Sequence, residues 1–173
     1  MCGNDLDVSV ATLGPQDWRD LRAIRLEALQ SEPAAYSASY EEVLARLDEE
    51  WRRRLADNHN VYLLAKAHSR PIGMVGGYLG SDDSDDSVAV VFGMYVAREY
   101  RGQGIGRLLL ASLIDRLSAL PQITTIRLGV TETREPARRL YQAVGFQVVG
   151  KTEDGIVVND RRYDELIMEL RVR

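Results

Sequence analysis

The stretch from Val88 to Arg107 constrains the fold of this chain more than any other, because three structural signals follow one another in it. Residues 88–96 are the most β-rich run in the sequence, glycines stand at positions 102, 104 and 106, and an apolar helical pattern comes next. Glycine permits positive φ and lets a ligand approach the backbone closely. The first turn of a helix offers unpaired N–H groups and the positive end of its dipole. The stretch therefore predicts a strand, an anion-binding loop and a helix in direct succession.

The other hydrophobic patterns predict strands and helices along the whole chain. Expected strands cover residues 6–13, 61–67, 72–78, 88–96, 123–130, 146–149 and 163–170. Expected helices follow Gly14-Pro15 and run through residues 40–55, 108–120 and about 134–144. Residues 68–71 resemble a hairpin connection, and residues 153–155 a turn after the sixth strand. The element order β-α-α-β-β-β-α-β-α-β-β indicates an α/β (α+β) domain with a mixed sheet.

The length of the chain, 173 residues, favours a single domain over residues 1–173, since domains usually hold about 100 to 200 residues. A composition of 45% apolar and 28% charged residues is ordinary for a globular protein. Cys2 is the single cysteine, which excludes an internal disulfide. The sequence has no apolar run near the ~20 residues of a membrane span, and its start does not resemble a secretory signal. We therefore expect a cytoplasmic protein that does not bind membranes.

Acidic residues concentrate in one loop, residues 81–87, which contains four aspartates and no basic residue. The whole chain has 22 basic and 26 acidic residues, so the rest of the chain is balanced. A protein without a basic excess is a poor candidate for binding nucleic acid. We interpret the loop as a solvated linker, with steering of a cationic substrate as the alternative.

The segment from Gly145 to Thr152 matches the P-loop pattern G-x-x-x-x-G-K-[ST], but its setting does not fit one. A P-loop follows a strand and opens a helix, whereas this segment follows a predicted helix and contains a predicted strand. The dinucleotide pattern G-x-G-x-x-G fails as well, because Arg107 stands where its third glycine would be. The glycine loop is therefore expected to bind a different phosphate-bearing ligand, or else only to start a helix.

Three motifs, in order, resemble those of the GCN5-related N-acetyltransferase (GNAT) family. Residues 101–106, RGQGIG, are similar to its (Q/R)-x-x-G-x-(G/A) loop. The signature L-x-V…A-x-x-L-Y-x-x-x-G-F is matched by residues 128–130, 137–141 and 145–146, and residues 163–170 look like the last strand of the family. The resemblance, which covers about residues 88–170, implies a mostly antiparallel central sheet of about seven strands flanked by four helices.

The resemblance implies an N-acetyltransferase that moves the acetyl group of acetyl-CoA directly to a primary amine of a small molecule or peptide. Such a reaction needs neither a covalent intermediate nor a metal. The backbone of Tyr95 and Val96 would pair with the pantetheine arm, and the Val96 N–H would be the oxyanion donor. The other cofactor contacts that the resemblance implies are Arg101, Gly102, Gln103, Gly104, Ile105, Gly106, Arg107, Arg134, Ala137 and Tyr141.

Tyr141 is the residue that the resemblance identifies as general acid to the leaving thiolate. The alternative is a buried aromatic ring that packs on Val130 and Val144. Arg134 stands where the family usually has Asn, and the strand 88–96 has no carboxylate, although many members carry a Glu there. The two departures keep a second function open, a noncatalytic acyl-CoA-binding or regulatory module.

The base that would deprotonate the amine is not assigned by any motif. His59 and His68 lie in polar turns, and we interpret both as surface residues. Glu32 and Tyr36 lie in the break between the first two predicted helices, which in this family usually borders the acceptor site. The identity of the acceptor is left open, and homodimers are common in the family.

Overall fold

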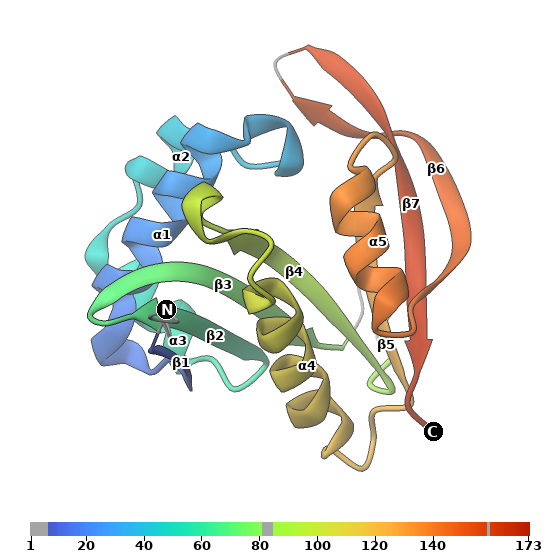
Figure 1. Cartoon of the computed structure of the whole chain (residues 1–173), viewed down its shortest axis with the longest axis horizontal. Coiled ribbons are helices and arrows are strands. Elements are labelled where there is room, and N and C mark those ends of the chain that lie inside the picture. Colours follow the sequence, from blue (N-terminus) through green and yellow to red (C-terminus); the bar gives the residue numbers. More distant parts are fainter. Residues whose placement is uncertain (1–6, 81–84, 159) are drawn as a thin grey trace, which may run out of the picture.

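A single twisted sheet of seven strands organises the computed structural model, which describes residues 7–80, 85–158 and 160–173 (Figure 1). The strand order is β1-β2-β3-β4-β5-β7-β6, and all neighbours are antiparallel except the parallel pair β4 and β5. The mixed, mostly antiparallel sheet that we predicted is confirmed. The strands are β1 (Val8–Thr12), β2 (Asn60–Ala67), β3 (Arg70–Leu79), β4 (Val88–Val96), β5 (Thr125–Thr131), β6 (Gln147–Val158) and β7 (Arg161–Arg171).

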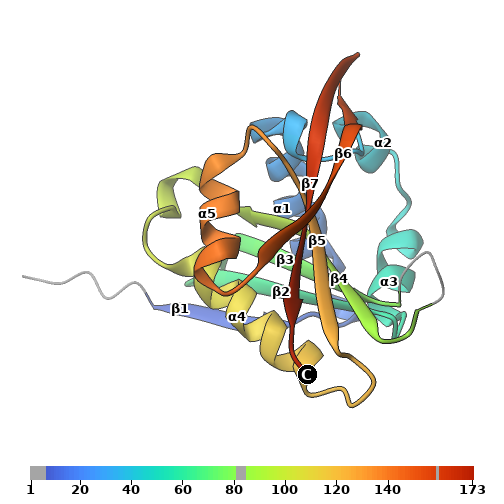
Figure 2. The ribbon, with the colours of Figure 1, turned by 90° about the vertical axis from the view of Figure 1, so that its right-hand side faces the viewer.

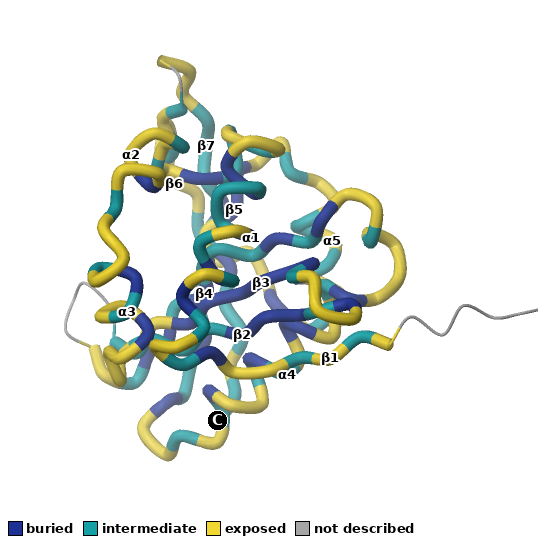
Figure 3. The backbone as a smooth tube through the Cα atoms, turned by 90° about the vertical axis from the view of Figure 1, so that its left-hand side faces the viewer, coloured by how far each residue is buried: buried dark blue, intermediate teal, exposed yellow. Residues whose placement is uncertain are grey.

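Helices cover both faces of the sheet (Figure 2). They are α1 (Trp18–Ser31), α2 (Tyr40–Leu44), α3 (Asp48–Ala56), α4 (Ile105–Ser118) and α5 (Glu135–Ala143). One buried cluster joins α1 and α3 to one face of β2–β4, and a larger cluster joins α4 and α5 to the opposite face. The buried residues accordingly lie along the central strands, while residues of the outer turns are exposed (Figure 3).

The single helix expected over residues 40–55 is wrong, because two helices occupy this stretch, so the described residues form five α-helices rather than four. Leu47 is the N-cap of α3 in an extended conformation, and its N–H donates to the Glu50 carboxylate at 2.7 Å. A side-chain acceptor at this position starts a new helix. Leu47 is 70% exposed and Leu44 43%, so neither belongs to a buried helical face.

The turn expected at residues 153–155 is also wrong, because β6 continues through them and pairs with β7 as far as Val158. The register between Thr152 and Ile156 shifts, and Asp154 adopts a φ of 53° there. A bulge absorbs the extra residues while the ladder goes on. The β6–β7 hairpin is therefore much longer than the sequence suggested.

The interpretations of the acidic loop and of Cys2 concern segments that are described only in part or not at all. Residues 81–84 of the acidic loop and Cys2 lie outside the described residues. Within the loop, the Asp85 carboxylate accepts hydrogen bonds from the N–H and the hydroxyl of Ser87, at 2.9 and 2.6 Å.

No helix in the described part of the chain is long and apolar enough to cross a membrane.

Helix α4 provides a direct stability test of this arrangement. Leu113 is completely buried between α4 and the sheet, whereas Leu108 on the same helix is 45% exposed. We expect Leu113→Ala to lower the free energy of unfolding by about 2–5 kcal/mol, because it leaves a cavity in the core. The matched variant Leu108→Ala should cost less than about 1 kcal/mol. Denaturant unfolding measures both, and equal losses would contradict the packing of α4.

Candidate functional site

A cleft of about 570 Å³ opens where β4 and β5 separate. The two parallel strands pair only from Val88 to Val91 on β4, opposite residues 125–128 of β5. Immediately afterwards β4 carries an extra residue relative to β3, and Gly93 adopts a φ of 65°. Such a bulge bends the strand and increases its twist. The second half of β4 therefore leaves β5 and forms one wall of the cleft, with α5 on the other side (Figure 1).

The backbone of β4 is exposed to this cleft. The Ala97 N–H donates to the Ile72 carbonyl of β3 at 2.8 Å. Because alternate residues of an antiparallel strand direct their backbone groups to opposite sides, those of Met94 and Val96 point away from β3. Side chains reach both carbonyls: the Tyr36 hydroxyl donates to Met94 at 3.0 Å, and Arg101 Nε donates to Val96 at 2.8 Å. The cleft thus has a strand edge that no strand of the described residues covers.

The glycine loop forms the end of the cleft at the start of α4. Gly102 and Gly104 have φ values of 75° and 81°, and Gly104 is the N-cap of α4. A Cβ on either glycine would meet no atom within 4 Å, so the left-handed backbone, and not crowding, requires glycine there. Gly106 has a different role, because a Cβ there would lie 3.2 Å from the side chains of Leu140 and Met94. The loop therefore combines free space with the positive end of a 14-residue helix.

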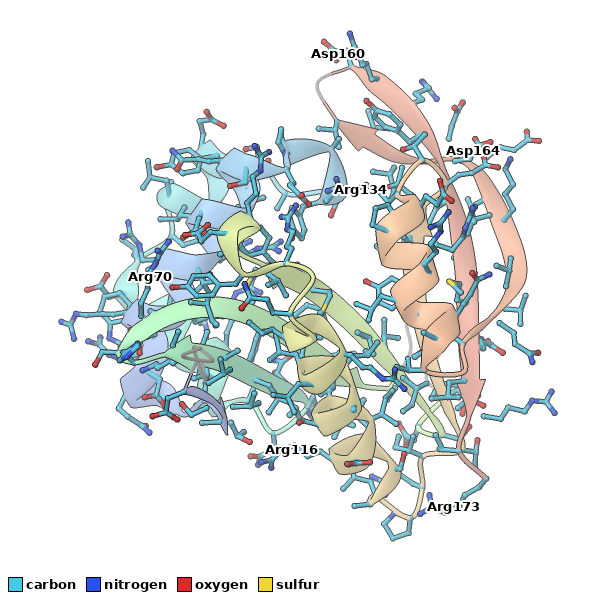
Figure 4. The ribbon with its side chains drawn as sticks, viewed as in Figure 1. Arg70, Arg116, Arg134, Asp160, Asp164 and Arg173 are labelled. Carbon is cyan, nitrogen blue, oxygen red and sulfur yellow. The ribbon has the colours of Figure 1, made fainter. Side chains whose placement is uncertain are left out.

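Glu32 joins the two sides of the cleft. Its carboxylate lies 2.7 Å from Arg101 on the glycine-loop side and 2.5 Å from Arg134 at the start of α5. Figure 4 shows Arg134 above α5, facing the segment that follows α1. The Glu32 carboxylate is therefore occupied by ion pairs with two guanidinium groups, one from each side of the cleft.

Two tyrosines line the cleft with different surroundings. Tyr141 on α5 is 7% exposed, its ring packs edge-on against Phe146, and burial raises its pKa to about 12. Its hydroxyl makes no hydrogen bond to the described residues. Burial raises the pKa of Tyr36 as well, and its hydroxyl is engaged by the Met94 carbonyl. Both phenols are protonated at neutral pH, but Tyr141 is the one with a proton free to donate.

Glu165 on β7 is a polar residue beside the cleft that no sequence motif identified. Its Oε1 lies 2.0 Å from the place that a Cβ on Gly129 would occupy, and Gly129 lines the cleft. The carboxylate makes no hydrogen bond or ion pair with any described side chain, and burial raises its pKa. The position of Glu165 beside Gly129 follows from the pairing of β5 with β7, which sets Thr131 opposite Glu165. This pairing is known only from the structure.

The structure brings the residues predicted for the site together, with one exception. Gln103 does not line the cleft, since its side-chain amide turns back to donate to the Glu99 carbonyl at 3.2 Å. Tyr95 also lines the cleft, but its backbone groups face β3 and its ring is buried in the cluster beneath α1, where the hydroxyl donates to Glu27 at 3.1 Å. The other predicted residues that line the cleft are Glu32, Tyr36, Val96, Arg101, Gly102, Gly104, Ile105, Gly106, Arg107, Arg134, Ala137 and Tyr141.

The residues that we interpreted as unrelated to the site lie away from it. Lys151 of the P-loop-like segment is within β6 and pairs with Glu132 and Asp164, at 2.9 and 2.7 Å. The helix that a P-loop requires does not follow it. His59 and His68 are exposed, as expected. Within residues 7–80, 85–158 and 160–173, no group of His, Cys, Asp or Glu is arranged to hold a metal ion.

Comparison with known proteins identifies relatives of this chain. Residues 18–146 match the model of the acetyltransferase (GNAT) family. N-alpha-acetyltransferase RimI of Mycobacterium tuberculosis is 31% identical over 137 residues, which are 76% of this chain and 83% of that protein. N-acetylaspartate synthetase of Danio rerio is 28% identical over 129 residues, 70% of this chain but only 44% of that protein.

Solved structures share the fold. An acetyltransferase of the GNAT family from Streptococcus pneumoniae superimposes with a TM-score of 0.79 and 21% identity, over 95% of this chain and 99% of the other. Arabidopsis thaliana NAA60, in complex with acetyl-CoA, superimposes with a TM-score of 0.75 and 18% identity, over 95% and 98% of the two chains. At these identities the likeness concerns the fold.

Proposed function

This chain belongs to the acetyltransferase (GNAT) family, and we propose on that basis that it transfers the acetyl group of acetyl-CoA directly to an amine. The observation that carries the proposal is the uncovered edge of β4, which leads into a glycine loop with two left-handed residues at the N-terminus of α4. The strand edge suits an amide-containing arm, and the helix start suits a pyrophosphate.

The residues present fit acetyl-CoA. When bound, it supplies an acetyl thioester, whose leaving group is a thiolate. The N–H groups of the glycine loop, with Arg101 and Arg107 beside them, would hold the phosphates, and the backbone of Val96 would hold the pantetheine arm. Arg101 contacts the Val96 carbonyl and Glu32. When acetyl-CoA binds, the Arg101 side chain would exchange these contacts for the phosphates.

Two groups of the chain would act on the thioester. The Val96 N–H points into the cleft and would stabilise negative charge that develops on the carbonyl oxygen. Tyr141, protonated and without a hydrogen-bond partner among the described residues, would donate a proton to the sulfur. Neither group forms a covalent bond to the acetyl group, so the acceptor amine attacks the thioester directly.

We assign the deprotonation of the acceptor amine to Glu165. An alkyl amine is largely protonated at neutral pH, so a base must take its proton before or during attack. Glu32, which lines the cleft, is paired with Arg101 and Arg134, whereas Glu165 beside the cleft forms no ion pair with a described residue and has a raised pKa. A raised pKa makes a carboxylate a stronger base. Gly129 would keep the path to it open, because any side chain there would displace the carboxylate.

The named relatives act on different amines, so the names do not settle the acceptor. Their names refer to an alanine of ribosomal protein bS18, to N-acetylaspartate and to spermine. Incubation of the protein with acetyl-CoA and a panel of amino acids, peptides and polyamines, with free thiol as the readout, tests the proposal. Release of CoA that depends on an amine supports acetyl transfer, whereas CoA binding without release with any amine would favour a noncatalytic binding module.

Removal of the Tyr141 hydroxyl should slow transfer without unfolding the protein. Phe keeps the ring and its contact with Phe146. A positioned acid contributes about 10²–10⁴-fold, but a thiolate with a pKa near 8.5 leaves fairly well unprotonated. We therefore expect Tyr141→Phe to lower kcat by about 10- to 100-fold, with little change in KM for acetyl-CoA. Steady-state kinetics measures this, with the melting temperature as control, and a kcat within twofold of wild type would make Tyr141 a packing residue.

Replacement of Glu165 should remove the base and its titration. Because the folded-state pKa of Glu165 is raised, wild-type kcat should fall as the pH drops through a value above that of an ordinary glutamate. Glu165→Gln should lower kcat by about 10- to 100-fold and lose that acidic limb. The matched control is Glu153→Gln, an exposed carboxylate of β6 that does not line the cleft. A pH profile of kcat decides, and an unchanged acidic limb in Glu165→Gln would assign the base elsewhere.

A further inference from the structure

A second pocket, of about 230 Å³, adjoins the cleft. Phe92 and Gly93, at the bulge of β4, line both spaces. The pocket lies on the face of the sheet that α1 and α3 cover, and its volume equals that of about eight water molecules. It is therefore large enough for one small polar group that extends from the cleft.

Three arginines from three different segments line this pocket. Arg25 comes from α1, Arg46 from the connection between α2 and α3, and Arg54 from α3. Arg25 stacks on Tyr36 at 4.4 Å, and Arg46 lies 5.7 Å from the ring centre of Trp51. The aromatic rings orient the two guanidinium groups, but they bring no negative charge.

No carboxylate of the described residues lies within 4 Å of the guanidinium groups of these three arginines. Two nearby carboxylates are used elsewhere, because Glu42 caps α2 and Glu50 caps α3. Burial, and then the neighbouring arginines, lower the pKa of Arg25 and of Arg46. The pocket thus gathers three guanidinium groups that form no ion pair with a described carboxylate.

Hydrogen-bond donors in the pocket also lack partners. In the described part of the chain, three buried side-chain polar atoms have no hydrogen bond, and two of them, Arg25 Nη1 and Trp51 Nε1, belong to residues of this pocket. A buried donor without an acceptor is costly. Arg25 Nη1 lies 3.7 Å from the place that a Cβ on Gly93 would occupy, so this donor is at the border with the cleft.

We propose that this pocket binds a carboxylate of the acceptor, so that the preferred acceptors are amines that carry an acidic group, such as acidic amino acids or peptides that begin with one. The inference rests on the proposed acetyl transfer and names its substrate class. Guanidinium groups bind a planar carboxylate with two parallel hydrogen bonds. The carboxylate would supply the anion that the arginines lack, while the amine stays in the cleft. A cationic acceptor such as a polyamine would be repelled.

Kinetics with matched acceptors tests the proposal. Aspartate is compared with asparagine, and glutamate with glutamine, both as free amino acids and as the first residue of short peptides. We expect kcat/KM to be at least about tenfold higher for the acids, because one charge-assisted pair contributes that much. Equal values for acids and amides would overturn the proposal.

Variants of the exposed arginine localise the effect without disturbing the core. Arg54→Gln should lower kcat/KM for the acidic acceptors by about tenfold, mainly through KM, and leave the amides unchanged. Arg53→Gln, on the same helix but outside the pocket, is the matched control. Arg25→Gln should have a larger effect, provided that its melting temperature matches wild type. No change in Arg54→Gln and in folded Arg25→Gln would refute the role of the pocket.

A binding experiment separates the pocket from the reaction. Calorimetric titration with aspartate and with asparagine, in the presence of CoA, should show tighter binding of the acid that Arg54→Gln weakens and Arg53→Gln does not. If this pattern appears but no acceptor releases thiol, the proposed transfer fails while the anion site stands. If thiol is released but the acid binds no better than the amide, the pocket assignment fails. Tighter binding of inorganic phosphate than of aspartate would also overturn the choice of a carboxylate.

Discussion

The separation of β4 from β5 is the feature on which the rest of the site depends. The two strands share only four paired positions before the bulge at Gly93 turns β4 away. A strand edge inside a sheet is unusual, because unpaired N–H and C=O groups are costly unless something hydrogen-bonds to them. Here Tyr36 and Arg101 reach two of the carbonyls. The parting of the strands also separates the start of α4 from α5, and so creates room for a ligand between them.

Charge is distributed unevenly around this opening. On the cofactor side, Glu32 lies between Arg101 and Arg134, so that one carboxylate neutralises part of a basic surface. By contrast, Arg25, Arg46 and Arg54 in the second pocket, and Glu165 on β7, form no ion pair with any described residue. The first arrangement holds the two walls of the cleft together. The second leaves unpaired charges of both signs, as expected where a ligand with an amine and an acid group is to be bound.

The sequence predicted the part of the site that lies on contiguous residues. The strand 88–96, the glycines and the start of α4 follow one another in the chain, so their spacing determines their geometry, and only Gln103 turned away. Helix 40–55 was predicted wrongly because its apolar spacing is the same whether the helix is continuous or broken at Leu47. Glu165 and the arginine pocket were not predicted, since they depend on the register of β7 against β5 and on three segments that meet only in the fold.

The central claim, that the glycine loop at the start of α4 holds the pyrophosphate of CoA, is tested most directly by the calorimetric affinity for CoA of two matched variants. Gly104→Glu adds a negative charge at the N-cap of α4, whereas Gly80→Glu makes the same change at a left-handed glycine that does not line the cleft. Both variants carry similar backbone strain, which melting temperatures will verify. We expect Gly104→Glu to weaken CoA binding by at least about 100-fold, because a carboxylate repels the phosphates at the helix N-terminus, and Gly80→Glu to leave it nearly unchanged. Equal CoA affinity in the two folded variants would contradict this claim.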